Sequence, residues 1–172
     1  MFRVRLVRTA RALAAVLLLA ACSAGPESPD ALFEEASRLA RAGDFGAFWD
    51  LYSREGREEY VKAVEGTQRT IRAEIRNGNR DGIRRLSEAD GITPEEFIAM
   101  TPRDIFVRRH KGLERVLEGA TIADRVTDPV NGRDVLLTVR NPRGQVFRWT
   151  VRHEDGRGWC FHSSALVSAG DR

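Results

Sequence analysis

Three residues near the C-terminus offer a thiol, an imidazole and a hydroxyl at alternate positions: Cys160, His162 and Ser164. Alternate residues of a β-strand share one face of a sheet, and a thiol activated by a nearby imidazole can act as a nucleophile. Neighbours on that face lie about 7 Å apart, which is long for a direct Cys–His hydrogen bond. No acidic residue of the segment can orient His162, and Trp159 and Phe161 occupy the opposite face, which we expect to be the core side. The pattern therefore predicts a structural Cys160 and no catalytic pair.

The other two histidines, His110 and His153, are candidates for metal or proton chemistry. His110 lies in a basic run with Arg109 and Lys111, which is typical of a charged helix end stabilised by the C-terminal dipole. His153 precedes two acidic residues and a glycine, a pattern typical of a solvated turn. No two of the three histidines have the spacing of metal ligands. We therefore predict no metal site and no cofactor.

Aromatic side chains recur at helical or strand spacing, a pattern typical of a hydrophobic core, although such residues can also line a cavity for a small apolar ligand. The candidates for lining such a pocket are Trp49, Tyr52, Phe97, Phe106 and Trp149. The residues expected to be largely buried are Trp49, Leu51, Val64, Ile71, Phe97, Phe106, Leu137, Val139, Phe147, Trp149 and Phe161.

Helix signals fill the first half of the chain. Ser28, Asp44 and Ser53 are typical N-cap residues, and Gly43 is typical of a helix end. They predict a helix over 29–42, a short aromatic helix over 45–52, and a longer helix whose apolar positions recur in steps of three and four up to Ile75. Capping boxes beginning at Thr93 and Thr101 predict short helices over 94–100 and 102–110, and a further short helix is expected over 79–89.

The second half changes to a strand pattern. Alternating, β-branched and aromatic runs cover 116–126, 134–140, 145–153 and 158–167, with turns rich in Pro, Gly, Asn and Asp between them. Short turns imply antiparallel hairpins. The sequence thus predicts an α+β fold in which N-terminal helices pack on one face of a curved, antiparallel C-terminal meander sheet. We assign residues 29–168 to a single domain and 169–172 to a tail.

Three features resemble the NTF2-like (SnoaL-like, cystatin-related) α+β cone: the opening helix ending in Ala42-Gly43-Asp44, the aromatic helix behind it, and the closing hairpin with Gly158-Trp159. The resemblance covers roughly 29–168 and implies a conical fold with a pocket between sheet and helices. It implies no single chemistry, because this fold hosts enzymes, binding modules and assembly domains. The stretch 76–112 holds more helix than a minimal member, and these helices can fill the pocket.

NTF2-like isomerases and hydratases require a carboxylate base and polar donors inside an apolar cone. In this sequence the resemblance points to Asp104, Tyr52 and Asp134 as candidates for such groups. Nothing in their spacing predicts that they converge, and so we name no catalytic residue.

The N-terminus has the parts of a secretory signal: four arginines, an apolar run over 12–21 that is too short to span a bilayer, and small residues before Cys22. The ending Leu19-Ala20-Ala21-Cys22 resembles the lipobox of bacterial lipoproteins. That resemblance implies cleavage after residue 21 and diacylglycerol attached to the sulfur of Cys22. An ordinary signal peptide cleaved near Ser23 is the alternative. Residues 22–28 then form a tether that holds the domain close to its membrane.

Charge and cysteine content narrow the function classes. The chain carries 28 basic and 25 acidic residues, and removal of the four signal arginines leaves the mature part close to neutral. A nucleic-acid partner is therefore not expected. The sequence has two cysteines, and since the lipid uses Cys22, Cys160 has no partner for an intramolecular disulfide.

These observations predict an envelope lipoprotein, anchored to a membrane and extracytoplasmic, with a non-catalytic domain that binds a small apolar ligand or another envelope protein. Ser23 rather than Asp after the lipidated cysteine favours the periplasmic face of the outer membrane, by the sorting rule known for enterobacterial lipoproteins. The alternatives are an NTF2-like enzyme acting on a small molecule and a structural lipoprotein bound to peptidoglycan.

Overall fold

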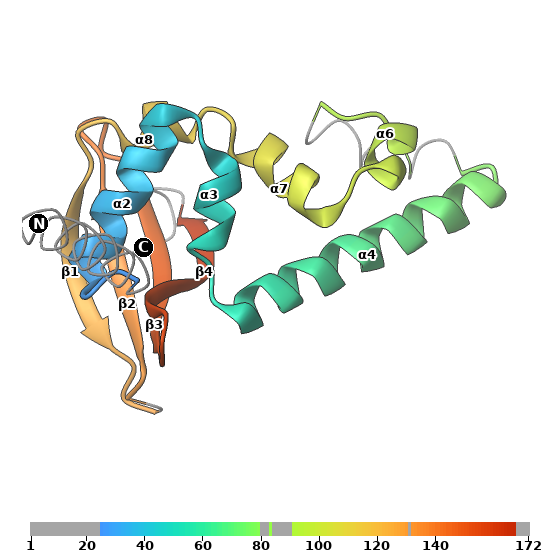
Figure 1. Cartoon of the computed structure of the whole chain (residues 1–172). Helices are drawn as coiled ribbons and strands as arrows, with labels where there is room; N and C mark the ends of the chain where they lie inside the picture. The colour runs from blue at the N-terminus through green and yellow to red at the C-terminus, as the bar shows by residue number, and fades with distance from the viewer. Residues whose placement is uncertain (1–24, 80–82, 84–90, 131, 168–172) are drawn as a thin grey trace, which may run out of the picture.

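The computed structural model has an α+β fold and describes residues 25–79, 83, 91–130 and 132–167 (Figure 1). Its elements in chain order are α2 (Pro29–Ala42), α3 (Phe45–Asp50), α4 (Arg54–Arg76), α6 (Pro94–Ala99), α7 (Pro102–His110), α8 (Leu113–Leu117), β1 (Thr121–Thr127), β2 (Asp134–Arg140), β3 (Val146–Glu154) and β4 (Gly158–Val167). The expected signal peptide, Cys22, most of the helix expected over 79–89 and the C-terminal tail lie outside the described residues.

The helices begin at the residues that the sequence indicates, although α3 ends at Asp50 and α6 at Ala99, slightly before the expected ends at 52 and 100. Side-chain oxygens of Ser28, Asp44 and Ser53 accept the free backbone N–H groups of the first turns of α2, α3 and α4, at 3.1, 2.9 and 2.9 Å. Gly43 ends α2 in the left-handed conformation, with φ of 69°. Thr93 and Thr101 form complete capping boxes with Glu96 and Asp104. Each such cap contributes about 1 kcal/mol to stability, and these helix predictions are confirmed.

The four strands form one antiparallel sheet in the order β1-β2-β3-β4, which confirms the predicted meander. Leu137 pairs with Trp149 and Val139 with Phe147, so that these apolar residues share one face of the sheet. The prediction of a first strand starting at residue 116 is wrong, because α8 occupies 113–117 and β1 starts at Thr121. Leu113, Val116 and Leu117 follow the helical spacing of three and four, and this spacing prevails over the strand preference of the β-branched Val116.

The main hydrophobic core lies between that face of the sheet and helices α2 and α3. Phe33 of α2 packs on Trp149 with ring centroids 5.8 Å apart, and Leu137 and Val139 are fully buried beneath the helices. Burying each large apolar side chain contributes on the order of 1.5–3 kcal/mol. Of the residues expected to be largely buried, Leu51 is the exception, since it is only half-buried.

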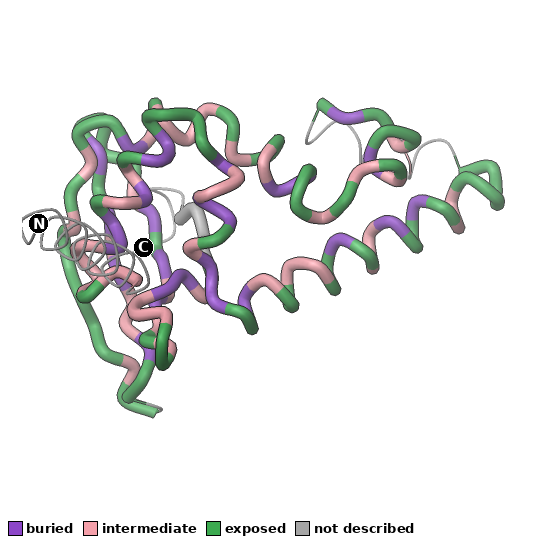
Figure 2. Tube along the Cα trace, in the orientation of Figure 1, coloured by how far each residue is buried: buried purple, intermediate pink, exposed green. Residues whose placement is uncertain are grey.

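A second apolar cluster forms away from the sheet, between α4, α6 and α7. Its buried members are Val64, Ile71, Ile92, Phe97 and Ile105. The side-chain amide of Gln68 donates to the carbonyls of Phe97 and Met100, both at 3.0 Å, and so ties α4 to α6. Figure 1 shows α4 projecting away from the sheet, and Figure 2 shows buried positions recurring along it. Only part of the helical half therefore covers the sheet.

Candidate functional site

A pocket of about 410 Å³ lies between the α7–α8 connection, the end of α3 and strand β3. Its walls are mainly aromatic and aliphatic, and its basic residues all come from the end of α7 and the residue that follows it. The lining residues are Phe48, Tyr52, Arg109, His110, Lys111, Gly112, Leu113, Val116, Phe147 and Trp149. This composition suits an apolar molecule better than a strongly polar one.

The aromatic wall is held in place by Phe161 of β4, which is buried behind it. Phe48 stacks on Phe161 with centroids 5.9 Å apart, while Tyr52 and Trp149 approach the same ring at 5.6 and 4.9 Å. Aromatic pairs at these distances add about 0.5–1.5 kcal/mol each beyond their burial. The wall is thus preformed and does not need a ligand to assemble.

His110 lies against this wall and not in solvent as a charged helix end. Its ring stacks on Phe106 with centroids 3.8 Å apart, and Nδ1 donates a hydrogen bond to the Phe106 carbonyl at 2.8 Å. Burial lowers the pKa of His110, and the nearby Arg109 charge lowers it further, whereas the bond to the carbonyl opposes the shift. The imidazole is therefore held neutral, with its proton on Nδ1.

The basic groups at the mouth differ in how firmly they are held. The guanidinium of Arg109 lies 5.6 Å from the centre of the Phe97 ring, a cation–π contact with the second cluster. Lys111 is exposed. None of the described residues that line the pocket carries a carboxylate. Arg109 and Lys111 therefore place two cationic side chains in the lining of the pocket.

The five predicted pocket residues are only partly brought together. Tyr52 and Trp149 line the pocket. Trp49 and Phe106 pack against each other 4.8 Å apart in the core beside it. Phe97 belongs to the second cluster. Sequence reasoning missed Lys111, Leu113 and Val116 as lining residues. It assigned residues from 116 onward to a strand and so did not predict α8, for which the helical spacing of Leu113 and Val116 was the available signal.

Cys160 is a packed side chain on β4. It is 2% exposed, and its Sγ lies 3.7 Å from the Gly158 carbonyl. Burial raises the pKa of its thiol, although the nearby Arg157 charge partly offsets the shift. A reactive cysteine requires a lowered pKa and access to solvent. This geometry agrees with a structural Cys160. Phe161 is buried as expected for the core side, whereas Trp159 is only half-buried.

His162 contacts Ser53, a residue 109 positions away. The Ser53 hydroxyl lies 3.3 Å from His162 Nδ1 and also accepts the backbone N–H of Gly56 at 2.9 Å. Ser53 is fully buried, so no substrate can reach its hydroxyl, and the residue serves as the cap of α4. The side chain of Ser164 lies outside the part of the chain that the structure describes. No sequence spacing could have indicated the Ser53–His162 contact.

The other polar candidates have structural partners outside the pocket. Asp104 closes the capping box of α7 by accepting the Thr101 hydroxyl at 2.6 Å. Asp134 pairs with Arg152 of the neighbouring strand through two hydrogen bonds of 2.5 and 2.9 Å. His153 is exposed and lies edge-on to Trp159. Tyr52 is thus the only one of the three proposed acid–base candidates that lines the pocket.

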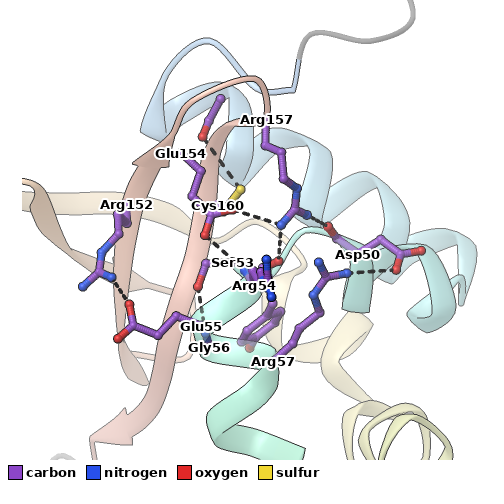
Figure 3. A network of polar contacts seen from close by, with 12 residues as sticks. Asp50, Ser53, Arg54, Glu55, Gly56, Arg57, Arg152, Glu154, Arg157 and Cys160 are labelled. Carbon is purple, nitrogen blue, oxygen red and sulfur yellow. Dashed lines mark hydrogen bonds and ion pairs between the residues drawn. The ribbon is translucent and has the colours of Figure 1, made fainter.

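Polar contacts around the β3–β4 turn hold the pocket residue Tyr52 in place (Figure 3). Arg157 donates to the backbone carbonyls of Asp50 and Tyr52, at 2.7 and 3.2 Å, and pairs with Glu154 at 3.1 Å. The carboxylate of Glu154 in turn accepts the backbone N–H of Arg54 at 3.1 Å. The network therefore fixes the end of α3 and the start of α4 against the sheet.

No family model, curated protein or solved structure matches this chain. Within the described ranges, no group of His, Cys, Asp and Glu side chains is arranged to hold a metal ion. No helix among the described residues is long and apolar enough to cross a bilayer.

Proposed function

We propose that the mature chain is a lipid-anchored protein of the bacterial cell envelope whose domain binds a small apolar ligand without catalysing a reaction. The pocket carries the binding part of this proposal, since it combines preformed aromatic walls with a basic mouth. The Leu19-Ala20-Ala21-Cys22 sequence supports the anchor. We further propose that the sheet with α2, α3 and α8 is an NTF2-like cone and that this pocket is its opening.

The pocket suggests the class of ligand. A volume of about 410 Å³ lies within the range of small-molecule sites. Phe48, Val116 and Trp149 offer apolar surface, while Arg109 and Lys111 favour a negative charge near the mouth. An apolar molecule with one anionic end matches both features.

The chemistry of the pocket favours binding over catalysis. An isomerase or hydratase of this fold needs a carboxylate base among its apolar walls, and the described lining has none. Asp104 and Asp134 are engaged elsewhere, and Cys160 is buried with a raised pKa. The enzyme alternative therefore lacks its central group.

Titration with 8-anilinonaphthalene-1-sulfonate, an aromatic anion, tests the site. We expect saturable binding with an increase in fluorescence, weakened in Lys111→Glu because a cation at the mouth becomes an anion. Arg115→Glu is the matched control, since it makes the same charge change on an exposed α8 residue outside the pocket lining. Val116→Trp should block binding by filling the pocket. Equal binding by all four proteins would place the probe elsewhere and contradict the proposal.

Metabolic labelling with a fatty acid, followed by cell fractionation, tests the anchor. Wild-type protein should carry label and sediment with membranes, and Cys22→Ala should do neither. Label that persists in the Cys22→Ala protein would show that the lipobox assignment is wrong. Recovery of wild-type protein mainly in the inner membrane would contradict the assignment to the outer membrane.

A further inference from the structure

The start of the described chain is bound to the beginning of β4. The backbone N–H of Trp159 donates to the Pro26 carbonyl at 2.8 Å. Gly25 and Gly158 approach so closely that a Cβ on Gly158 would lie 2.9 Å from the Gly25 carbonyl carbon. A Cβ on Gly25 would overlap the Arg157 carbonyl. The chain is therefore fixed to the domain from Gly25 onward, and the free tether is shorter than the sequence suggests.

Only three peptide steps separate Gly25 from Cys22, which span at most about 11 Å when fully extended. If Cys22 carries the lipid, as the proposed function requires, the β3–β4 turn must lie within roughly that distance of the lipid headgroups. Strand β4 has 10 residues and so extends about 30 Å along the sheet. The opposite end of the sheet is beyond the reach of the tether.

The tether contacts the end of the sheet at which β3 ends and β4 begins. In the antiparallel sheet, β1 ends and β2 begins at this same end, so the connection between β1 and β2 lies there too. Figure 1 shows this connection at the lower tip of the sheet. Val130 lies in it and is 91% exposed, and Val126 at the end of β1 is 48% exposed. The turn is shaped by Asp128, whose side chain accepts the backbone N–H of Val130 at 2.8 Å. Two of the three exposed large hydrophobic residues in the described chain thus gather at the tethered end.

We propose that this end of the sheet is the membrane-facing surface of the protein and that Val130 inserts between lipid headgroups. Asp128, Arg133 and Asp155 give the surface charges of both signs, so contact does not depend on anionic lipid. The partner of this surface is the same bilayer into which the lipid on Cys22 would insert.

Site-specific fluorescence in proteoliposomes tests the orientation. The lipidated full-length mature protein is reconstituted into phosphatidylcholine vesicles with a nitrobenzoxadiazole probe on Val130→Cys. The matched control carries the probe on Arg143→Cys, an exposed residue in the β2–β3 connection at the opposite end of the sheet. Labelling is selective because the native Cys160 is buried. We expect a blue-shifted emission, quenched by spin-labelled lipid, at position 130 and an aqueous emission at position 143.

The outcomes separate this inference from the anchor on which it rests. If the protein floats with the vesicles while both probes report water, the orientation is wrong and the anchor stands. Quenching at position 143 alone would show the reverse orientation and also overturn the inference. If mass spectrometry finds no lipid on Cys22 and the protein does not float, the anchor itself fails and the inference falls with it.

Discussion

Replacing Gly56 with alanine tests how closely helix α4 approaches strand β4. A Cβ at this position would lie 3.0 Å from the Ser53 hydroxyl and 3.1 Å from the His162 carbonyl carbon, and closer still to the carbonyl oxygen. The close neighbour is backbone of β4, which cannot rotate away as a flexible side chain can. Alanine at position 56 should therefore force α4 and β4 apart.

The expected magnitude is a balance of two effects. Alanine is favoured over glycine inside a helix by about 1 kcal/mol, whereas overpacking of a closely fitted site costs about 1–3 kcal/mol. Displacement also weakens the Ser53–His162 contact. We expect a net loss of about 1–2 kcal/mol in the free energy of unfolding, which is a substantial part of the stability of a typical domain.

Gly66 of the same helix is the matched control. A Cβ there would meet only the guanidinium of Arg69, at 3.8 Å. Gly66→Ala should therefore raise stability by about 0.5–1 kcal/mol through helix propensity alone. Urea denaturation of the mature protein, followed by circular dichroism, measures both variants. Equal stabilisation by the two substitutions would show that α4 does not pack against β4 at Gly56.

Three further predictions follow from buried side chains. Phe106→Ala should lower the free energy of unfolding by about 3–5 kcal/mol, because this ring is 1% exposed in the main core; an unchanged urea midpoint would show that the core is misplaced. Iodoacetamide should modify Cys160 slowly in the folded protein and rapidly after unfolding, and fast modification that is lost in His162→Ala would revive the catalytic pair. Because the pKa of His110 is lowered by folding, the unfolded chain takes up its proton first as pH falls, so stability should decrease below about pH 6.5. In urea titrations above and below that pH, His110→Gln should lose this component of the pH dependence, and an unaltered dependence would contradict the half-buried, neutral imidazole.

Local signals were sufficient to predict most elements of the fold. Caps such as Ser28 and Asp44 bond to backbone groups three residues away in the chain. The alternation of residue types over 134–140 lies within a single strand. Structure that depends on residues this close in the chain can be predicted from sequence. The five-residue helix α8 was missed because it is a single turn between two glycines, and its β-branched Val116 favours a strand. A signal this short competes poorly with the preferences of its residues.

The candidate site could be predicted only in part, because the contacts that assemble it are remote in sequence. Tyr52 and Trp149 were selected for their residue type, but nothing in the spacing places Lys111 beside them. Phe97 has the same apolar character, yet it packs with α4 in the second cluster. Residue type gives the chemistry available to a pocket, whereas the direction of α4 decides which aromatic residues reach it.

The start of α4 is held at the turn between β3 and β4. The turn contacts the tether through Trp159, the end of α3 through Arg157, and the first N–H of α4 through Glu154. The same short segment therefore positions Tyr52 in the pocket wall, holds the first turn of α4, and holds the chain that leads toward Cys22. If Cys22 carries the proposed lipid, only three peptide steps separate the anchor from Gly25, and the contacts that hold Gly25 and Pro26 to the start of β4 would then orient the domain on the membrane.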